Sequence, residues 1–167
     1  MVGWRGLLTI MLLVGSAESP LASPLDASGE LSLLGGYGIT HRHMGATRSE
    51  VQTIDAALRF GHFLSGELAK GSWYATRHEL YLEFPLHLVV EPRTRLMTGL
   101  HLLGCWKFTA LANAGIYPYA IGGGGPLYND LGLSTQGTRL NYSYQGGFGV
   151  QHTLTRDTAV MAEWRYH

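Results

Sequence analysis

The stretch Arg139–Val150, RLNYSYQGGFGV, decides the fold predicted for this 167-residue chain. Its large apolar and aromatic residues are Leu140, Tyr142, Tyr144, Phe148 and Val150. They fall on every second position, and the residues between them from Arg139 to Gln145 are polar. Because successive side chains of a β-strand point to opposite faces, this alternation predicts a strand with one apolar and one polar face.

The same alternation recurs along the rest of the chain. The seven predicted strands are Leu31–His43, Val51–Leu64, His78–Glu91, Leu96–Ala110, Ile116–Tyr128, Arg139–Val150 and Asp157–His167. Short connections between them favour antiparallel up-and-down pairing. In the fifth strand, Gly122–Gly125 precede Pro126, which predicts a bulge, a bend or a loop there. No helix is expected after these glycines, so they do not indicate a phosphate site.

Alternation alone does not say which face of the sheet is outside. A soluble lipocalin-like barrel has its apolar face inside, whereas an outer-membrane barrel turns it toward lipid. The charged residues of the polar face are Asp55, Glu79, Glu83, Glu91 and Glu163 against Arg59, Lys107, Arg139 and Arg165. Such near balance suits a narrow interior, where an unpaired buried charge is costly. We therefore predict an all-β, antiparallel, up-and-down outer-membrane β-barrel.

The N-terminal residues are typical of an exported protein. Arg5, the apolar run Gly6–Val14 and the small residues that follow predict a signal peptide over residues 1–17, with cleavage after Ala17 or Ala22. The apolar run is about half the roughly 20 residues of a spanning helix. Residues 18–30, rich in Pro, Ser and Ala, are predicted to be disordered, which leaves residues 31–167 for the barrel. The expected location is the bacterial outer membrane.

The predicted number of strands is odd. Bacterial single-chain barrels have an even number, and an open sheet would leave two unpaired edges in lipid. We therefore expect an eighth strand in the parent protein and interpret this sequence as truncated at its C-terminus. The formal net charge is zero, which gives no field to attract nucleic acid.

From about Gly35 onward the chain resembles the PagL-type lipid A deacylases, a family of outer-membrane ester hydrolases. Four stretches carry the resemblance: Glu79–Pro85 (ELYLEFP), Tyr117–Tyr119 with Gly122–Gly124, Gly137–Val150 (GTRLNYSYQGGFGV) and Ala162–His167 (AEWRYH). The last is similar to the opening of the family's Tyr-Arg-x-His-x-Ser-Asn motif. The resemblance implies hydrolysis of an ester-linked acyl chain of lipopolysaccharide by Ser, His and Glu residues, without a cofactor.

The resemblance also implies where the site residues lie. The family's catalytic His follows the motif's Arg by three positions, which places it one residue beyond His167, so the catalytic residues are expected beyond this fragment. His167 remains a weaker catalytic candidate, because its odd position shares a face with Glu163 and Arg165 rather than with Tyr166. On the neighbouring strand, Tyr142 and Tyr144 are candidate groove residues on the outward face, and the resemblance implies that the aromatic ring at Tyr142 packs along an acyl chain. The alternative for both residues is an ordinary lipid-facing aromatic with no special role.

The remaining candidates indicate little chemistry. His41 and His43 have a spacing that can bind metal, but no third ligand is evident, so no metal site is predicted. The single cysteine, Cys105, is expected to pack within a strand. Two other functions stay open: a non-enzymatic outer-membrane barrel with a structural or adhesive role, and a periplasmic lipocalin-like carrier. The expected partners are lipid A and outer-membrane lipid, and formation of a homodimer stays open.

Overall fold

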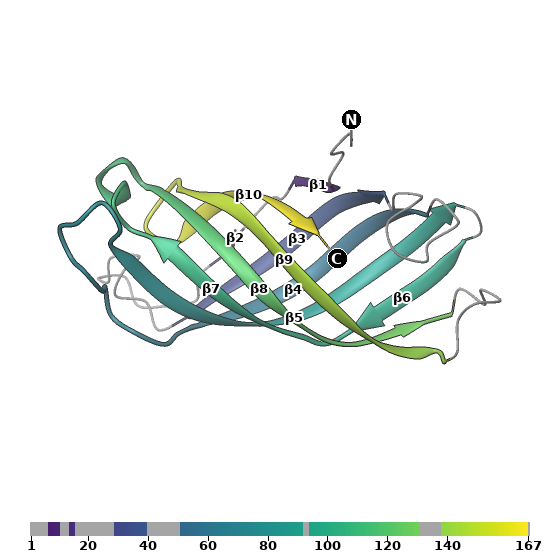
Figure 1. The fold of residues 1–167 in the computed structure, drawn as a ribbon. Coiled ribbons are helices and arrows are strands. Elements are labelled where there is room, and N and C mark those ends of the chain that lie inside the picture. The colour runs from purple at the N-terminus through teal and green to yellow at the C-terminus, as the bar shows by residue number, and fades with distance from the viewer. Residues whose placement is uncertain are drawn as a thin grey trace, which may run out of the picture.

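A computed structural model describes residues 7–10, 14–15, 29–39, 51–91, 94–130 and 138–166. Within these ranges the chain is all-β, apart from one short 3-10 turn, η1 (Ala112–Ala114) (Figure 1). The strands are β1 (Leu7–Ile10), β2 (Val14–Gly15), β3 (Gly29–Ile39), β4 (Gln52–Phe63), β5 (Thr76–Glu91), β6 (Arg95–Gly99), β7 (His101–Phe108), β8 (Ile116–Asn129), β9 (Leu140–Thr153) and β10 (Thr158–Tyr166).

The strands form one antiparallel, up-and-down sheet. β3 pairs with β4, and β4 pairs with β5. β5 then pairs with both β6 and β7, each of which pairs with β8. The order continues from β8 to β9 and from β9 to β10. All seven predicted strands are present, and the fold class is confirmed at the level of an all-β, antiparallel, up-and-down sheet.

Two details of the predicted strands differ from the structure. The stretch Leu96–Ala110 is divided into β6 and β7, with the break at Leu100, whose amide donates a hydrogen bond to the Pro126 carbonyl. Of the bulge, bend or loop predicted at Gly122–Gly125, the bulge and the loop are wrong, because β8 pairs with β9 without a shift from Ile116 to Tyr128. Glycine suits this close approach of strands: a Cβ on Gly123, whose φ is 157°, would collide with the Leu102 carbonyl oxygen.

The N-terminal strands lie beside both ends of this series. β1 pairs with β10, while β2 pairs with β10 on one side and with β3 on the other. Both strands fall within the predicted signal peptide, which stays a prediction. β3 begins at Gly29, so the disorder predicted for residues 18–30 is wrong at Gly29 and Glu30. Residues 18–28 lie outside the described ranges.

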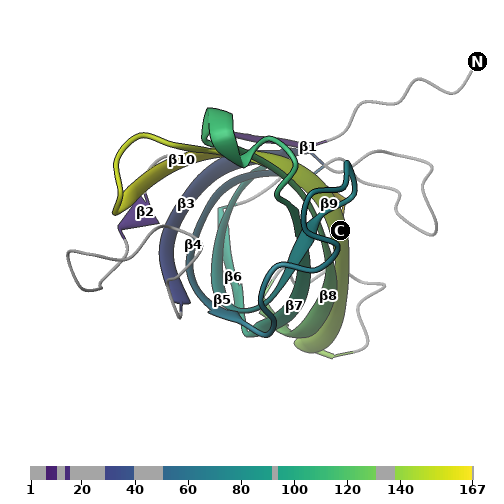
Figure 2. The ribbon, with the colours of Figure 1, turned by 90° about the vertical axis from the view of Figure 1, so that its left-hand side faces the viewer.

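The sheet is strongly curved and encloses an interior, as the view along the strands in Figure 2 shows. Large apolar side chains point away from this interior, and Leu33 and Phe148 are 57% and 62% exposed. The buried polar residues are Ser32, Thr53, Arg59, Arg77, Glu79, Glu83, His101, Lys107, Thr109, Gln145, Gln151, Glu163 and Arg165. The sheet therefore has the reverse of the usual soluble arrangement, with its polar face inside and its apolar face outside.

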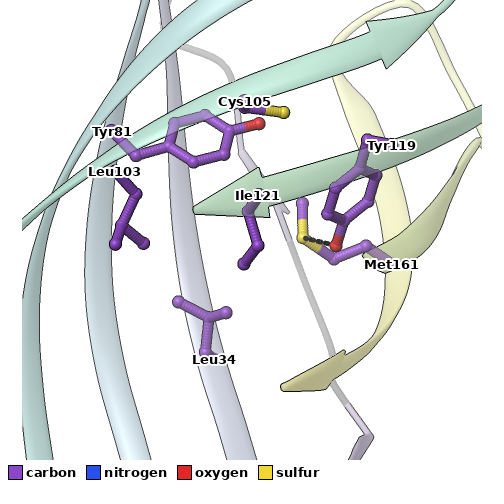
Figure 3. Packing of buried hydrophobic residues seen from close by; sticks show 7 residues of the cluster. All are labelled: Leu34, Tyr81, Leu103, Cys105, Tyr119, Ile121 and Met161. Carbon is purple, nitrogen blue, oxygen red and sulfur yellow. Dashed lines mark hydrogen bonds between the residues drawn. The ribbon is translucent and has the colours of Figure 1, made fainter. Parts of the chain in front are cut away.

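A small apolar cluster accompanies the buried polar residues. Its members are Leu34, Tyr81, Leu103, Cys105, Tyr119, Ile121 and Met161 (Figure 3). The Tyr119 hydroxyl lies 3.6 Å from the Met161 sulfur. Cys105 is buried and free of disulfides, in keeping with its predicted packing role.

Candidate functional site

Four charged side chains form an ion-pair network inside the sheet. Arg59 on β4 donates from Nε to Glu83 at 2.9 Å and from Nη1 to Glu163 at 3.2 Å. Arg165 donates to both carboxylate oxygens of Glu83, at 2.6 and 2.7 Å, and also contacts Glu163. Two guanidinium groups thus face two carboxylates, and all four side chains are nearly or fully buried.

Neutral side chains extend this ion-pair network across the interior. Tyr119 on β8 donates its hydroxyl to Glu163 at 2.8 Å, and its ring belongs to the apolar cluster. Gln145 on β9 accepts a hydrogen bond from Arg165 at 3.1 Å, and its amide nitrogen lies 2.7 Å from Nδ1 of His101. The network therefore connects β4, β5, β7, β8, β9 and β10, which gives the interior a fixed arrangement.

A second charged cluster lies around Lys107 on β7. Its ammonium group is 2.8 Å from Glu79 and 3.1 Å from Glu30. Nearby, the Arg77 guanidinium stacks over the Phe63 ring at 3.4 Å. The predicted burial of paired charges is thus correct for Glu79 and Lys107.

The prediction that the charged side chains at strand ends face the interior is wrong. Glu91 and Arg139 are exposed, because they lie where β5 ends and just before β9 begins. Conversely, two charged side chains that are nearly buried, those of Glu30 and Arg77, were not predicted to face inward. Arg77 could have been found by extending the predicted strand His78–Glu91 by one residue toward its N-terminus, since Arg77 has the same parity as Glu79. Asp55 is partly buried and pairs with His87 at 2.7 Å.

An open groove of about 590 Å³ lies on the outer face of the sheet. Its lining residues are Leu102, Gly123, Gly124, Tyr142, Tyr144, Gln145, Gly146 and Tyr166. The candidate residues Tyr142 and Tyr144 are among them, and their ring centroids are 4.7 Å apart. Tyr166 lies opposite Gly146, and Tyr144 lies opposite Gly124. The missing side chains of these glycines leave the space between the aromatic rings.

The groove suits an apolar chain better than it suits bond breaking. Its wall offers tyrosine rings, a leucine and bare backbone, and none of its eight lining residues is Ser, Cys, His, Asp or Glu. Gln145 joins the groove to the interior, because it lines the groove and also contacts His101 and Arg165. No role was predicted for Gln145 from the sequence. His167, the weaker catalytic candidate, lies outside the described residues.

Searches for metal sites and membrane-spanning helices found neither in the described parts of the chain. No group of three or more His, Cys, Asp or Glu residues there could hold a metal ion, and His41 and His43 lie outside those parts. In the same ranges, no helix has the length and apolar character needed to cross a bilayer.

Comparisons with protein-family models, with curated proteins and with solved structures gave no match.

Proposed function

We propose that this chain is the greater part of an outer-membrane β-barrel that removes an ester-linked acyl chain from lipid A. The observation that carries the membrane part is the reversed sheet, with paired charges inside and an apolar band outside. In water, the many exposed large apolar residues of this band would form an apolar surface of a kind that soluble monomers rarely show. In lipid the same band is stabilising, while the strands match the length that crosses a bilayer at a tilt.

The carrier hypothesis explains these observations less well. A lipocalin-like carrier needs an apolar cavity inside the barrel for its ligand. Here the centre holds Arg59, Glu83, Glu163 and Arg165 in mutual contact. The apolar groove lined by Tyr142 and Tyr144 opens on the outer face instead.

The lipid A substrate is supported by the groove together with the resemblance. Tyr142 and Tyr144 line an apolar groove on the face that would contact lipid, where an acyl chain can enter from the side. In the resembled family the chemistry is acyl transfer: a His takes the proton of the nucleophilic Ser, and a carboxylate orients the His. Because Arg165 fixes the register of that motif, the proposal places these residues after His167. A structural or adhesive barrel is the alternative, in which the groove contacts only bulk lipid.

Cell fractionation tests the membrane part. The chain expressed in a Gram-negative host is expected in the outer-membrane fraction, and detergent is expected to be required to extract it. The measurement is immunoblotting of periplasmic, inner-membrane and outer-membrane fractions. Recovery of folded chain in the periplasmic fraction without detergent would favour the carrier.

A lipid A deacylation assay tests the enzyme part. The 167-residue chain in vesicles containing lipopolysaccharide is expected to release no fatty acid, whereas the chain extended by the codons that follow His167 in its gene is expected to release one. Mass spectrometry of lipid A gives the readout. Fatty acid release by the shorter chain that His167→Ala abolishes would overturn the placement of the catalytic residues.

A matched pair of variants in the extended protein tests the groove. Gly146→Leu would fill the groove, and a Cβ there meets only the Ile121 carbonyl oxygen at 3.7 Å. Gly35→Leu adds the same side chain at an exposed position on β3, with nothing within 4 Å of its Cβ. Deacylation should fall only in the first variant, by at least about tenfold if acyl-chain positioning is lost. Equal rates would favour the structural alternative.

A further inference from the structure

Without β1 and β2, the sheet would have two free edges, one on β10 and one on β3. We call the place where these two edges face each other the seam. β10 pairs with β9 on one side, and β3 pairs with β4 on one side. The opposite edge of each strand carries backbone N–H and C=O groups that need partners. In lipid, each such group left without a partner costs several kcal/mol, so an unfilled seam is incompatible with a stable barrel.

The chain's own N-terminal strands lie in this seam. β1 pairs with β10, with Leu7 opposite Arg165 and Ile10 opposite Ala162. β2 continues along the same edge, with Val14 opposite both Ala159 of β10 and Ser32 of β3. Both run antiparallel to β10, and β2 is also antiparallel to β3. That is the direction an eighth strand must take in an up-and-down barrel.

We propose that the segment containing β1 and β2 acts as the closing strand of this sheet and is retained in the folded protein. This goes beyond the proposed function and concerns the 167-residue chain, because a C-terminal eighth strand in the extended protein would take the same place between β10 and β3. The same residues are predicted to form a signal peptide, and the two uses exclude each other within one molecule. Cleavage after Ala17 or Ala22 would detach β1 and β2 and leave the facing edges of β10 and β3 to another strand.

The test is a disulfide cross-link across the seam. Directly opposed residues of antiparallel strands have Cα atoms about 4.5–5.5 Å apart, which is within disulfide range. Ile10→Cys with Ala162→Cys, in a Cys105→Ala background, is expected to cross-link in most molecules after mild oxidation of the membrane-inserted chain. The off-register pair Ile10→Cys with Val160→Cys should not cross-link, because Val160 lies two residues away from Ala162 along β10.

Intact-mass measurement of the extracted chain gives a second readout that needs no cysteine. The proposal requires residues 1–17 to be present in molecules that resist protease in the membrane. It is overturned if the protected chain begins at Glu18 or Ser23, or if the in-register pair cross-links no more than the off-register pair. Neither readout involves lipid A or hydrolysis, so failure here is distinguishable from failure of the proposed function.

Discussion

Replacement of Arg59 by methionine is expected to destabilise the folded chain by about 3–5 kcal/mol, the usual loss when one partner of a buried ion pair is removed. Arg59 is fully buried and bonds to both Glu83 and Glu163. Methionine fills part of the volume of the arginine side chain. Arg165 is then the one guanidinium left in the four-residue network, and it faces the carboxylates of both Glu83 and Glu163. The uncompensated negative charge then lies in an interior with little water to solvate it.

Urea unfolding of the protein inserted in lipid vesicles measures this loss. The matched control is Arg139→Met, because Arg139 pairs with Asp130 at the surface, where their side chains are 73% and 44% exposed. Its loss is expected to be about 0–1 kcal/mol, as for exposed ion pairs generally. The double variant Arg59→Met with Glu163→Met restores charge balance and should recover part of the stability. Equal losses in the two single variants would contradict the buried network.

The sequence predicted the strands well because alternation is a local property. Arg59, Glu83 and Glu163 each lie between two apolar residues of their strand. Because the apolar residues face outward, the alternation places all three charged side chains on the inward face. Their mutual contacts do not follow from parity. Arg59 and Glu163 are 104 residues apart, and they meet because the curved sheet brings β4 and β10 across one interior. Partner identity depends on that curvature and on strand register, which local patterns do not specify.

The candidate site was predicted only in part, for related reasons. Tyr142 and Tyr144 could be placed on the outer face because their strand has clear alternation. The groove itself depends on Gly124, Gly146 and Tyr166 coming together from three strands, which is a matter of register. Glu30 was missed because the Pro- and Ser-rich residues before it predict disorder. A single charged residue gives no sign that it will meet Lys107 on β7.

Replacement of Leu58 by arginine is expected to destabilise the barrel by about 2–4 kcal/mol, as found for Arg at the bilayer midplane on the lipid face of a barrel. Leu58 lies near the middle of β4 and is 39% exposed. Its register partners are Leu33 on β3 and Phe84 on β5, which are also exposed. A guanidinium at this position would have to leave water for an apolar band, or deform the lipid to reach water.

Leu154→Arg is the matched control, because it introduces the same change at a more exposed leucine outside the strands. Leu154 is 56% exposed and lies in the turn between β9 and β10. Away from the bilayer midplane the expected loss is about 0–1 kcal/mol. If the sheet instead folded in water, both leucines would be ordinary surface residues, and both changes would stay within about 0.5 kcal/mol. Both variants replace a partly exposed leucine by arginine. The difference between their free energies of unfolding in urea therefore reports whether lipid or water surrounds the outer face of β4.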